Sequence, residues 1–183
     1  VIEETTVAIA NEKLCCNYAE GFVGYKLKGG EYVCDCSAID DILIIRKDGT
    51  YTVRKVQEKE YVGKKILYVG VFRKNDSRTT FNVVYQDGAF GKYYVKRFNI
   101  TSIIRSRDYD ITQGTKGSKI VYMSVNPNGE AEVINVVMKP APRLKTNRME
   151  YNFADLAIKS RGSKGNILTH RVISSISRKT EGI

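Results

Sequence analysis

The chain has 183 residues, of which 42% are hydrophobic and 27% charged, and it contains only 3 Pro. This length and balance are typical of a folded domain or a short array of repeats, and they exclude a disordered tail. No apolar run reaches the roughly 18–20 residues of a membrane span. No basic stretch followed by an apolar one opens the chain, so we expect no secretory signal and a cytoplasmic location. The start without Met predicts a part of a longer polypeptide.

The charge is unevenly distributed along the chain. The net charge is +10, but residues 1–44 hold three Lys and eight acidic residues, whereas residues 45–183 hold 27 basic and 12 acidic residues. The two stretches therefore carry −5 and +15. Such asymmetry favours a surface on the later stretch that binds a polyanion. A basic protein that is merely soluble would have the same net charge, so charge alone leaves both interpretations open.

Four cysteines, Cys15, Cys16, Cys34 and Cys36, all lie in the acidic first stretch. Their spacing is not that of the paired Cys-x-x-Cys knuckles of a structural zinc site. In a strand, neighbouring cysteines point to opposite faces, so four ligands would not converge. We interpret them as small buried hydrophobic residues that stay reduced, and we expect no metal site.

The secondary-structure signal is overwhelmingly β. The chain is rich in Val, Ile, Tyr and Thr, in short runs broken by Gly, Asn and Asp. Three segments predict hairpins with a turn at their centre: residues 41–56 around Asp48-Gly49, 81–98 around Asp87-Gly88, and 120–137 around Asn128-Gly129. Two weaker segments are residues 14–27, around Glu20-Gly21, and 156–169, with a longer turn.

The turn glycines Gly49, Gly88 and Gly129 are 39 and 41 residues apart. A repeat of about 40 residues, each a small antiparallel sheet, is typical of a propeller-like array. A single irregular sandwich with regularly spaced turns is the alternative. Trp is absent, so the repeats lack the Trp-Asp signature of WD-repeat blades.

A catalytic centre is not indicated. The only histidine, His170, lies between Thr169 and Arg171, and no partner for a nucleophilic triad is evident. The chain has no phosphate-binding P-loop, no dinucleotide fingerprint, no His-Glu-x-x-His and no calcium loop. The carboxylates of Asp40 and Asp41 would diverge in a strand, so we interpret this pair as turn and edge chemistry rather than an acid–base pair.

Basic residues recur beside glycines in two segments. Residues 113–119 include Lys116 and Lys119, and residues 159–166 include Lys159, Arg161, Gly162, Lys164 and Gly165. Glycine lets a backbone approach phosphate closely, while Lys and Arg supply charge. Further basic residues would extend the track: Lys96, Arg97, Arg105, Arg107, Arg143, Lys145 and Arg148. An ordinary solvated turn is the alternative for any one of these loops.

Six segments together carry a resemblance to a known family: residues 17–25 (NYAEGFVGY), 40–49 (DDILIIRKDG), 93–98 (YYVKRF), 107–110 (RDYD), 126–132 (NPNGEAE) and 153–166 (FADLAIKSRGSKGN). The chain resembles the C-terminal domain of bacterial type IIA topoisomerase A subunits, in particular the topoisomerase IV type of Bacteroides-like bacteria. The resemblance covers nearly the whole chain.

The resemblance implies one β-pinwheel domain over residues 1–183, an array of four-stranded antiparallel blades that exchange strands and bind and bend duplex DNA. Blade number and closure of the array stay open. Gyrase members carry a box that reads Gln-Arg/Lys-Arg-Gly-Gly-Arg/Lys-Gly. Residues 159–165 match it at Arg161, Gly162, Lys164 and Gly165 and depart from it at Lys159, Ser160 and Ser163. These departures favour topoisomerase IV, which captures a DNA segment for relaxation and decatenation, over gyrase-like wrapping.

The resemblance also implies what the domain lacks. The cleaving tyrosine of the family directly follows an arginine, and no Arg-Tyr pair occurs in this sequence. We therefore expect no catalysis and no cofactor in this domain, with ATP and Mg²⁺ bound elsewhere in the parent enzyme. The expected partners are duplex DNA, the remainder of the A-type polypeptide and the ATPase B subunit, at the nucleoid and not at a membrane. The alternatives are a protein-binding β-propeller whose basic face meets an acidic partner, and a small all-β enzyme.

Overall fold

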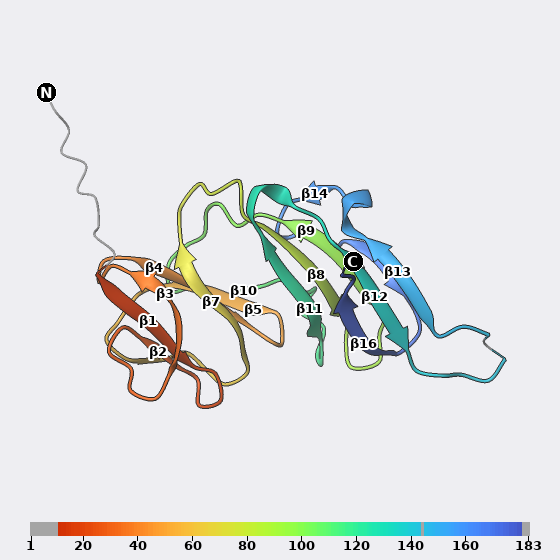
Figure 1. The fold of residues 1–183 in the computed structure, drawn as a ribbon, viewed down its shortest axis with the longest axis horizontal. Helices are drawn as coiled ribbons and strands as arrows, with labels where there is room; N and C mark the ends of the chain where they lie inside the picture. Colours follow the sequence, from red (N-terminus) through yellow and green to blue (C-terminus); the bar gives the residue numbers. More distant parts are fainter. Residues whose placement is uncertain (1–10, 144, 181–183) are drawn as a thin grey trace, which may run out of the picture. The chain divides into compact units, whose positions relative to one another are not determined.

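The computed structural model describes residues 11–143 and 145–180 (Figure 1). Within these ranges the chain forms β-strands and two short 3₁₀ helices, and no α-helix, so the all-β prediction is confirmed. It divides into two compact units. Unit 1 comprises the described residues up to Lys74 together with Ile103–Tyr109, and unit 2 comprises Asn75–Ser102 and the described residues from Asp110 onward.

Unit 1 contains two small sheets with the strand orders β3-β1-β2-β6 and β10-β5-β4-β7. The first is built from β1 (Glu12–Asn17), β2 (Phe22–Gly24), β3 (Glu31–Cys36) and β6 (Glu60–Tyr61). The second is built from β4 (Asp41–Arg46), β5 (Thr50–Lys55), β7 (Ile66–Phe72) and β10 (Tyr109–Asp110). The pairings β1–β2 and β4–β5 confirm the hairpins predicted around Glu20-Gly21 and Asp48-Gly49.

The core of unit 1 is formed by side chains from both of its sheets. Cys16 and Cys36 are fully buried in it beside aliphatic residues such as Leu14, Ile42 and Ile44. All four cysteines are free thiols. Burial raises the pKa of both Cys16 and Cys36 to about 11, which keeps these thiols protonated. Cys16 and Cys36 therefore pack as small buried hydrophobic residues, as the sequence predicts, whereas Cys15 and Cys34 are only half-buried.

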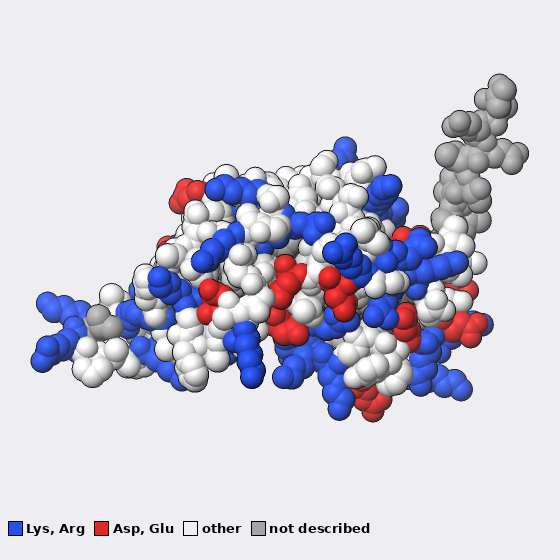
Figure 2. Space-filling model, turned by 180° about the vertical axis from the view of Figure 1, so that it is seen from behind, with Lys and Arg blue, Asp and Glu red and all other residues white. Residues whose placement is uncertain are grey.

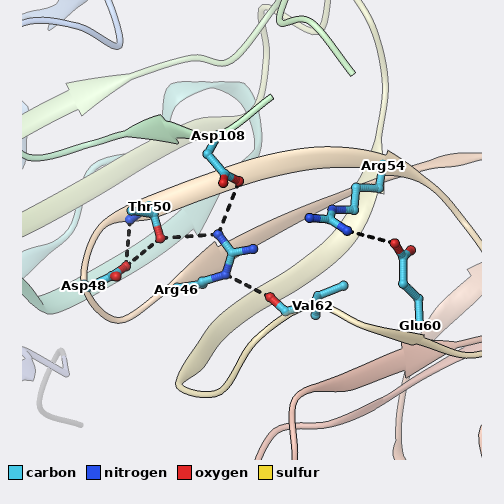
Figure 3. Close-up of polar contacts among 7 residues, drawn as sticks. All are labelled: Arg46, Asp48, Thr50, Arg54, Glu60, Val62 and Asp108. Atoms are coloured by element: carbon cyan, nitrogen blue, oxygen red, sulfur yellow. Dashed lines mark hydrogen bonds and ion pairs between the residues drawn. The ribbon is translucent and has the colours of Figure 1, made fainter. Parts of the chain in front are cut away.

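Arg46 fixes the later segment of unit 1 to its second sheet (Figure 3). Its Nε donates to the carbonyl oxygen of Val62 at 2.9 Å, and its Nη1 lies 3.3 Å from Thr50 Oγ1 and 3.6 Å from Asp108 Oδ1. Thr50 is in turn held by Asp48, which closes the β4–β5 turn. One guanidinium thus joins a turn, a loop and a segment 62 residues later (46 to 108).

Unit 2 also contains two sheets. The first has the order β11-β8-β9-β14, and β15 pairs with β9 as well; the second has the order β13-β12-β16. The strands of the first are β8 (Thr80–Gln86), β9 (Tyr93–Phe98), β11 (Lys119–Asn126), β14 (Ile158–Lys159) and β15 (Asn166–Thr169). Those of the second are β12 (Val133–Met138), β13 (Arg148–Asn152) and β16 (Ile173–Arg178). The β8–β9 pairing confirms the hairpin around Asp87-Gly88.

The hairpin predicted around Asn128-Gly129 is wrong. A short 3₁₀ helix, η1 (Pro127–Gly129), connects β11 to β12, but the two strands do not pair. Instead, β11 pairs with β8, whereas β12 pairs with β13 and β16 in the other sheet. The turn residues therefore mark a corner at which the chain passes from one sheet to the next. This arrangement of small antiparallel sheets joined by a crossing chain is the pattern that the β-pinwheel prediction requires.

Cys16 and Cys36 give a test of the core packing of unit 1. We expect maleimide to label Cys16 and Cys36 only after unfolding, because they are buried and their pKa of about 11 leaves roughly one thiolate in a thousand at pH 8. Peptide mapping by mass spectrometry, with and without urea, measures the labelling. Equal labelling of these two residues in both conditions would contradict the packing.

Candidate nucleic-acid interface

Both basic glycine segments lie in unit 2. The loop of residues 159–166 extends from the outer edge of β9. β14 pairs in parallel with the end of β9, with Ile158 opposite Arg97, and β15 pairs antiparallel with its beginning, with Asn166 opposite Val95. The hairpin predicted for residues 156–169 is therefore wrong, because its two strands pair with β9 and not with each other. The same edge of β9 pairs with β14 and with β15. The residues between these two strands leave the sheet beside Lys96.

Lys96 is 1% exposed and lies beneath this loop. Its ammonium donates three hydrogen bonds to backbone carbonyl oxygens, at 2.6 Å to Ile111, 2.8 Å to Arg161 and 2.9 Å to Ser163. An ammonium has three donors, so all are used. Two of these bonds hold the 159–166 loop, and the third holds the strand end that leads into the loop of residues 113–119. One buried cation thus anchors both basic loops.

Aromatic rings complete the surroundings of this ammonium. Nζ of Lys96 lies 5.0 Å from the ring centroid of Phe98 and 5.9 Å from that of Tyr85. Burial lowers the pKa of Lys96 to about 8 from an ordinary value of 10.5, and the Asp110 carboxylate opposes this shift. The side chain is therefore mostly protonated at neutral pH and keeps its three donors.

Tyr85 is a second point at which the two loops meet. Its buried hydroxyl donates to the carbonyl oxygen of Lys164 and also has a hydrogen bond with the side chain of Gln113. Burial raises the pKa of this hydroxyl well above its usual value of 10.0. The ring of Tyr85 stacks on Tyr94, and the Lys164 ammonium lies 5.1 Å from the centroid of Tyr94. The loop backbones are therefore fixed while their basic side chains face outward.

The predicted site residues of both basic segments lie on the two loops that Lys96 anchors. Lys159, Lys164, Lys116 and Lys119 are exposed, and Arg161 is half-buried. On the face shown in Figure 2, Lys and Arg side chains are widespread, and Asp and Glu side chains are fewer. The 113–119 loop is also tied to the β8–β9 turn, because Ser118 Oγ accepts a hydrogen bond from the Gly88 backbone at 2.8 Å. The loops thus present cations from a rigid backbone.

Lys96 and Arg97 lie in the interior, so the structure corrects the expectation that they form part of an exposed track. Arg97 is 6% exposed, and all its guanidinium nitrogens are bonded. Its partners are Asn82 Oδ1 and the carbonyl oxygens of Gly129, Glu130, Phe153 and Leu156. Phosphate has no access to a guanidinium enclosed in this way. Successive residues of a strand point to opposite faces, so Lys96 holds the loops while Arg97 holds the other face.

Asn82 connects Arg97 to a buried carboxylate. Its amide donates to Glu132 Oε2 at 2.9 Å, and the other oxygen of Glu132 accepts from the hydroxyls of Tyr122 and Ser124. Burial by itself would raise the pKa of Glu132, but the three side-chain donors outweigh it and lower the pKa below its usual value. These three donors satisfy both carboxylate oxygens of Glu132, and Asn82 links them to the Arg97 guanidinium.

Arg105 and Arg107 lie in the other unit, in Ile103–Tyr109, and both are exposed. Arg105 forms an ion pair with Asp41 at 3.0 Å, and the Arg107 guanidinium lies 5.7 Å from the ring centroid of Tyr109. Asp40 Oδ2 accepts a hydrogen bond from the Ser37 backbone and so serves a turn, as predicted, whereas Asp41 begins β4, which has neighbours on both sides and is not an edge strand. These two arginines therefore belong to unit 1, whereas both basic loops belong to unit 2.

Neither a metal-ligand cluster nor a membrane-spanning helix occurs among the described residues. The described residues contain no group of three or more His, Cys, Asp or Glu side chains that could hold a metal ion. His170 is exposed. Within the same ranges, no helix has the length and apolar character to cross a bilayer.

Comparison with known proteins identifies the family. A family model described as the topoisomerase C-terminal domain of Bacteroidota matches residues 13–181. The chain belongs to this family. This topoisomerase C-terminal domain is also 32% identical, over 122 residues, to the A subunit of DNA topoisomerase 4 from Borreliella burgdorferi. That match covers 66% of the domain and 19% of the Borreliella protein. The resemblance stated from the sequence is thus confirmed.

Gly165, not Gly162, carries the conformational requirement of the 159–166 loop. Gly165 has a φ of +87°, and a Cβ there would lie 2.3 Å from the carbonyl oxygen of Val95. We expect Gly165→Ala to lower the free energy of unfolding by about 2 kcal/mol or more. Gly162→Ala is the control, because no atom lies within 4 Å of its added Cβ. Urea denaturation compares the two, and equal stability would contradict the geometry.

The Lys96 anchor gives a second stability prediction. Lys96→Met leaves three carbonyl oxygens without their donor, so we expect the free energy of unfolding to fall by about 2–4 kcal/mol. Lys92→Met is the control, because Lys92 is exposed and immediately precedes the same strand, β9. It should change the free energy of unfolding by less than about 0.5 kcal/mol. Urea denaturation at pH 7 measures both.

A pH series gives a readout specific to the Lys96 ammonium. The folded-state pKa of about 8 lies below the ordinary 10.5, so the unfolded chain binds more protons between these values. This group therefore makes the free energy of unfolding rise with pH across that window. Lys96→Met should lose this contribution, whereas an unchanged pH dependence would contradict the lowered pKa of Lys96.

Proposed function

We propose that this domain binds duplex DNA without sequence preference and serves as an accessory domain of a topoisomerase IV-like A subunit. The observation that carries the proposal is that two basic glycine loops are anchored on one buried ammonium, in a chain of the topoisomerase C-terminal family. The basic residues outside the acidic first stretch supply the charge that phosphates need.

The chemistry of the loops favours phosphate contacts over base reading. Lys159, Lys164, Lys116 and Lys119 offer mobile ammonium groups, and the loop backbones offer N–H groups beside glycines. Base-edge reading requires an element that enters a groove, most often an α-helix, and the described residues contain none. Contacts of this kind position a duplex and tolerate any sequence.

In the parent enzyme, we propose that the domain bends a DNA segment and presents it for strand passage during relaxation and decatenation. Topoisomerase function is supported by the relative from Borreliella burgdorferi, which is named as part of DNA topoisomerase 4. We place the cleavage chemistry outside this domain, because its sequence has no Arg-Tyr pair. The remainder of the A-type polypeptide and an ATPase B subunit, with ATP and Mg²⁺, would complete the enzyme in the cytoplasm at the nucleoid.

A salt titration tests the DNA-binding proposal. We expect the affinity for several unrelated duplexes to be similar, and log K to fall with log[salt] at a slope of about −0.9 per phosphate contact. Arg161→Ala with Lys164→Ala should weaken binding to every duplex alike and reduce the slope by about 2, one for each lost contact. Fluorescence anisotropy of labelled duplexes measures both quantities.

Lys26→Ala with Lys28→Ala is the matched control, because it removes the same charge from exposed positions in unit 1. This variant should retain the slope of the unmodified domain. Strong discrimination among duplexes, or no binding at low salt, would refute the proposal. Binding that only an acidic protein supports would instead favour the protein-interaction alternative.

A further inference from the structure

Phe90 stands apart from every other large hydrophobic side chain that the structure describes. It is 99% exposed, whereas the next most exposed, Ile39 and Ile104, are each 60% exposed. It lies in the β8–β9 connection, the turn predicted around Asp87-Gly88. A fully exposed Phe contributes almost no buried area to folding, so its ring is apolar surface available to a binding partner.

The turn that carries Phe90 is rigid. Asp87 N donates to the carbonyl oxygen of Lys92 at 2.9 Å, and a Cβ at Gly91 would lie 1.6 Å from the carbonyl oxygen of Asp87. The 113–119 loop supports the turn from the side, since a Cβ at Gly117 would lie 2.9 Å from Ala89. The backbone that carries the ring is therefore held by contacts within the turn and with the 113–119 loop.

Exposed lysines belong to the backbone segments next to this tip. Lys92 follows it in the chain, Lys119 lies opposite Gln86 at its base, and the carbonyl oxygen of Lys116 lies 3.8 Å from the Cβ position of Gly88. Asp87, which is half-buried, is the acidic residue of the turn. The tip thus combines one aromatic ring with three cations and one carboxylate.

We propose that Phe90 is a wedge that inserts at a base step of the bound duplex, while the lysines around it contact the flanking phosphates. A duplex has an anionic exterior and a stack of apolar base faces inside it, and this tip complements both. Apolar side chains inserted in this way unstack a step and kink the duplex. The inference rests on the proposed function and extends it, because it names the group that bends the DNA.

The absence of Trp from the sequence makes the proposal directly measurable. Phe90→Trp introduces a single indole at the tip, and stacking on bases should quench its fluorescence when duplex DNA is added at low salt. Tyr32→Trp is the matched control: Tyr32 is an exposed aromatic residue, 59% exposed, in the acidic first stretch. Its emission should not change. Anisotropy of labelled DNA, recorded in the same samples, reports binding independently.

A second variant separates the ring from the charges. Phe90→Ala should weaken duplex binding by about fivefold or more, the affinity equivalent of one base–aromatic stack. It should leave the salt slope unchanged, because it removes no charge. It should also reduce the bend of a duplex labelled at both ends for energy transfer. Folding should not be affected, since the ring contributes no buried surface.

The outcomes distinguish the two proposals. Binding by Phe90→Trp without quenching would overturn the wedge and leave the DNA-binding function intact. An unchanged affinity and bend for Phe90→Ala would also overturn the wedge. No binding by any variant at low salt would overturn both proposals. Quenching or a blue shift with anionic lipid vesicles, but not with DNA, would assign the tip to a membrane surface and overturn the wedge.

Discussion

The buried ammonium of Lys96 is the interaction on which the candidate site depends. It is positioned by the central strand of the largest sheet and reaches carbonyl oxygens that are 15, 65 and 67 residues away in sequence. A side chain with fewer donors could not hold all three. Because the donors belong to a strand and the acceptors to loops, the loops inherit the rigidity of the sheet. Their glycines and cations therefore keep a defined arrangement, as the proposed phosphate contacts require.

Arg97 extends the same principle to the opposite face of β9. Consecutive side chains in a strand point in opposite directions, so Lys96 bonds segments on one face of the sheet and Arg97 bonds segments on the other. Arg97 holds η1, and it also holds η2 (Phe153–Asp155), the short helix that precedes the 159–166 loop. The two residues thus define where this loop begins and where it returns to the sheet. Charge that looks like a ligand-binding surface in the sequence is here the internal support of that surface.

The difference between local and long-range contacts explains which features could be predicted from the sequence. The hairpins at Asp48-Gly49 and Asp87-Gly88 were predictable because turn and strand signals are local. Asn128-Gly129 has the same local signal, but the strands beside it pair with distant strands, and no local signal specifies that. The basic loops could be found from composition. The burial of Lys96 could not, since two of its acceptors are more than 60 residues away; the one available sign was a Lys-Arg pair within an otherwise apolar strand.

The path of the chain through unit 1 has a consequence for synthesis. The segment Ile103–Tyr109 supplies Asp108 to Arg46, Arg105 to Asp41 and the Tyr109 ring that stacks on Tyr51. On a ribosome these residues emerge only after β8 and β9 of unit 2, so unit 1 cannot be completed until part of unit 2 has been synthesised. Synthesis of unit 1 is therefore interrupted by synthesis of the first segment of unit 2. A nascent chain that stalls after Lys74 would expose the second sheet of unit 1 without the segment that secures it.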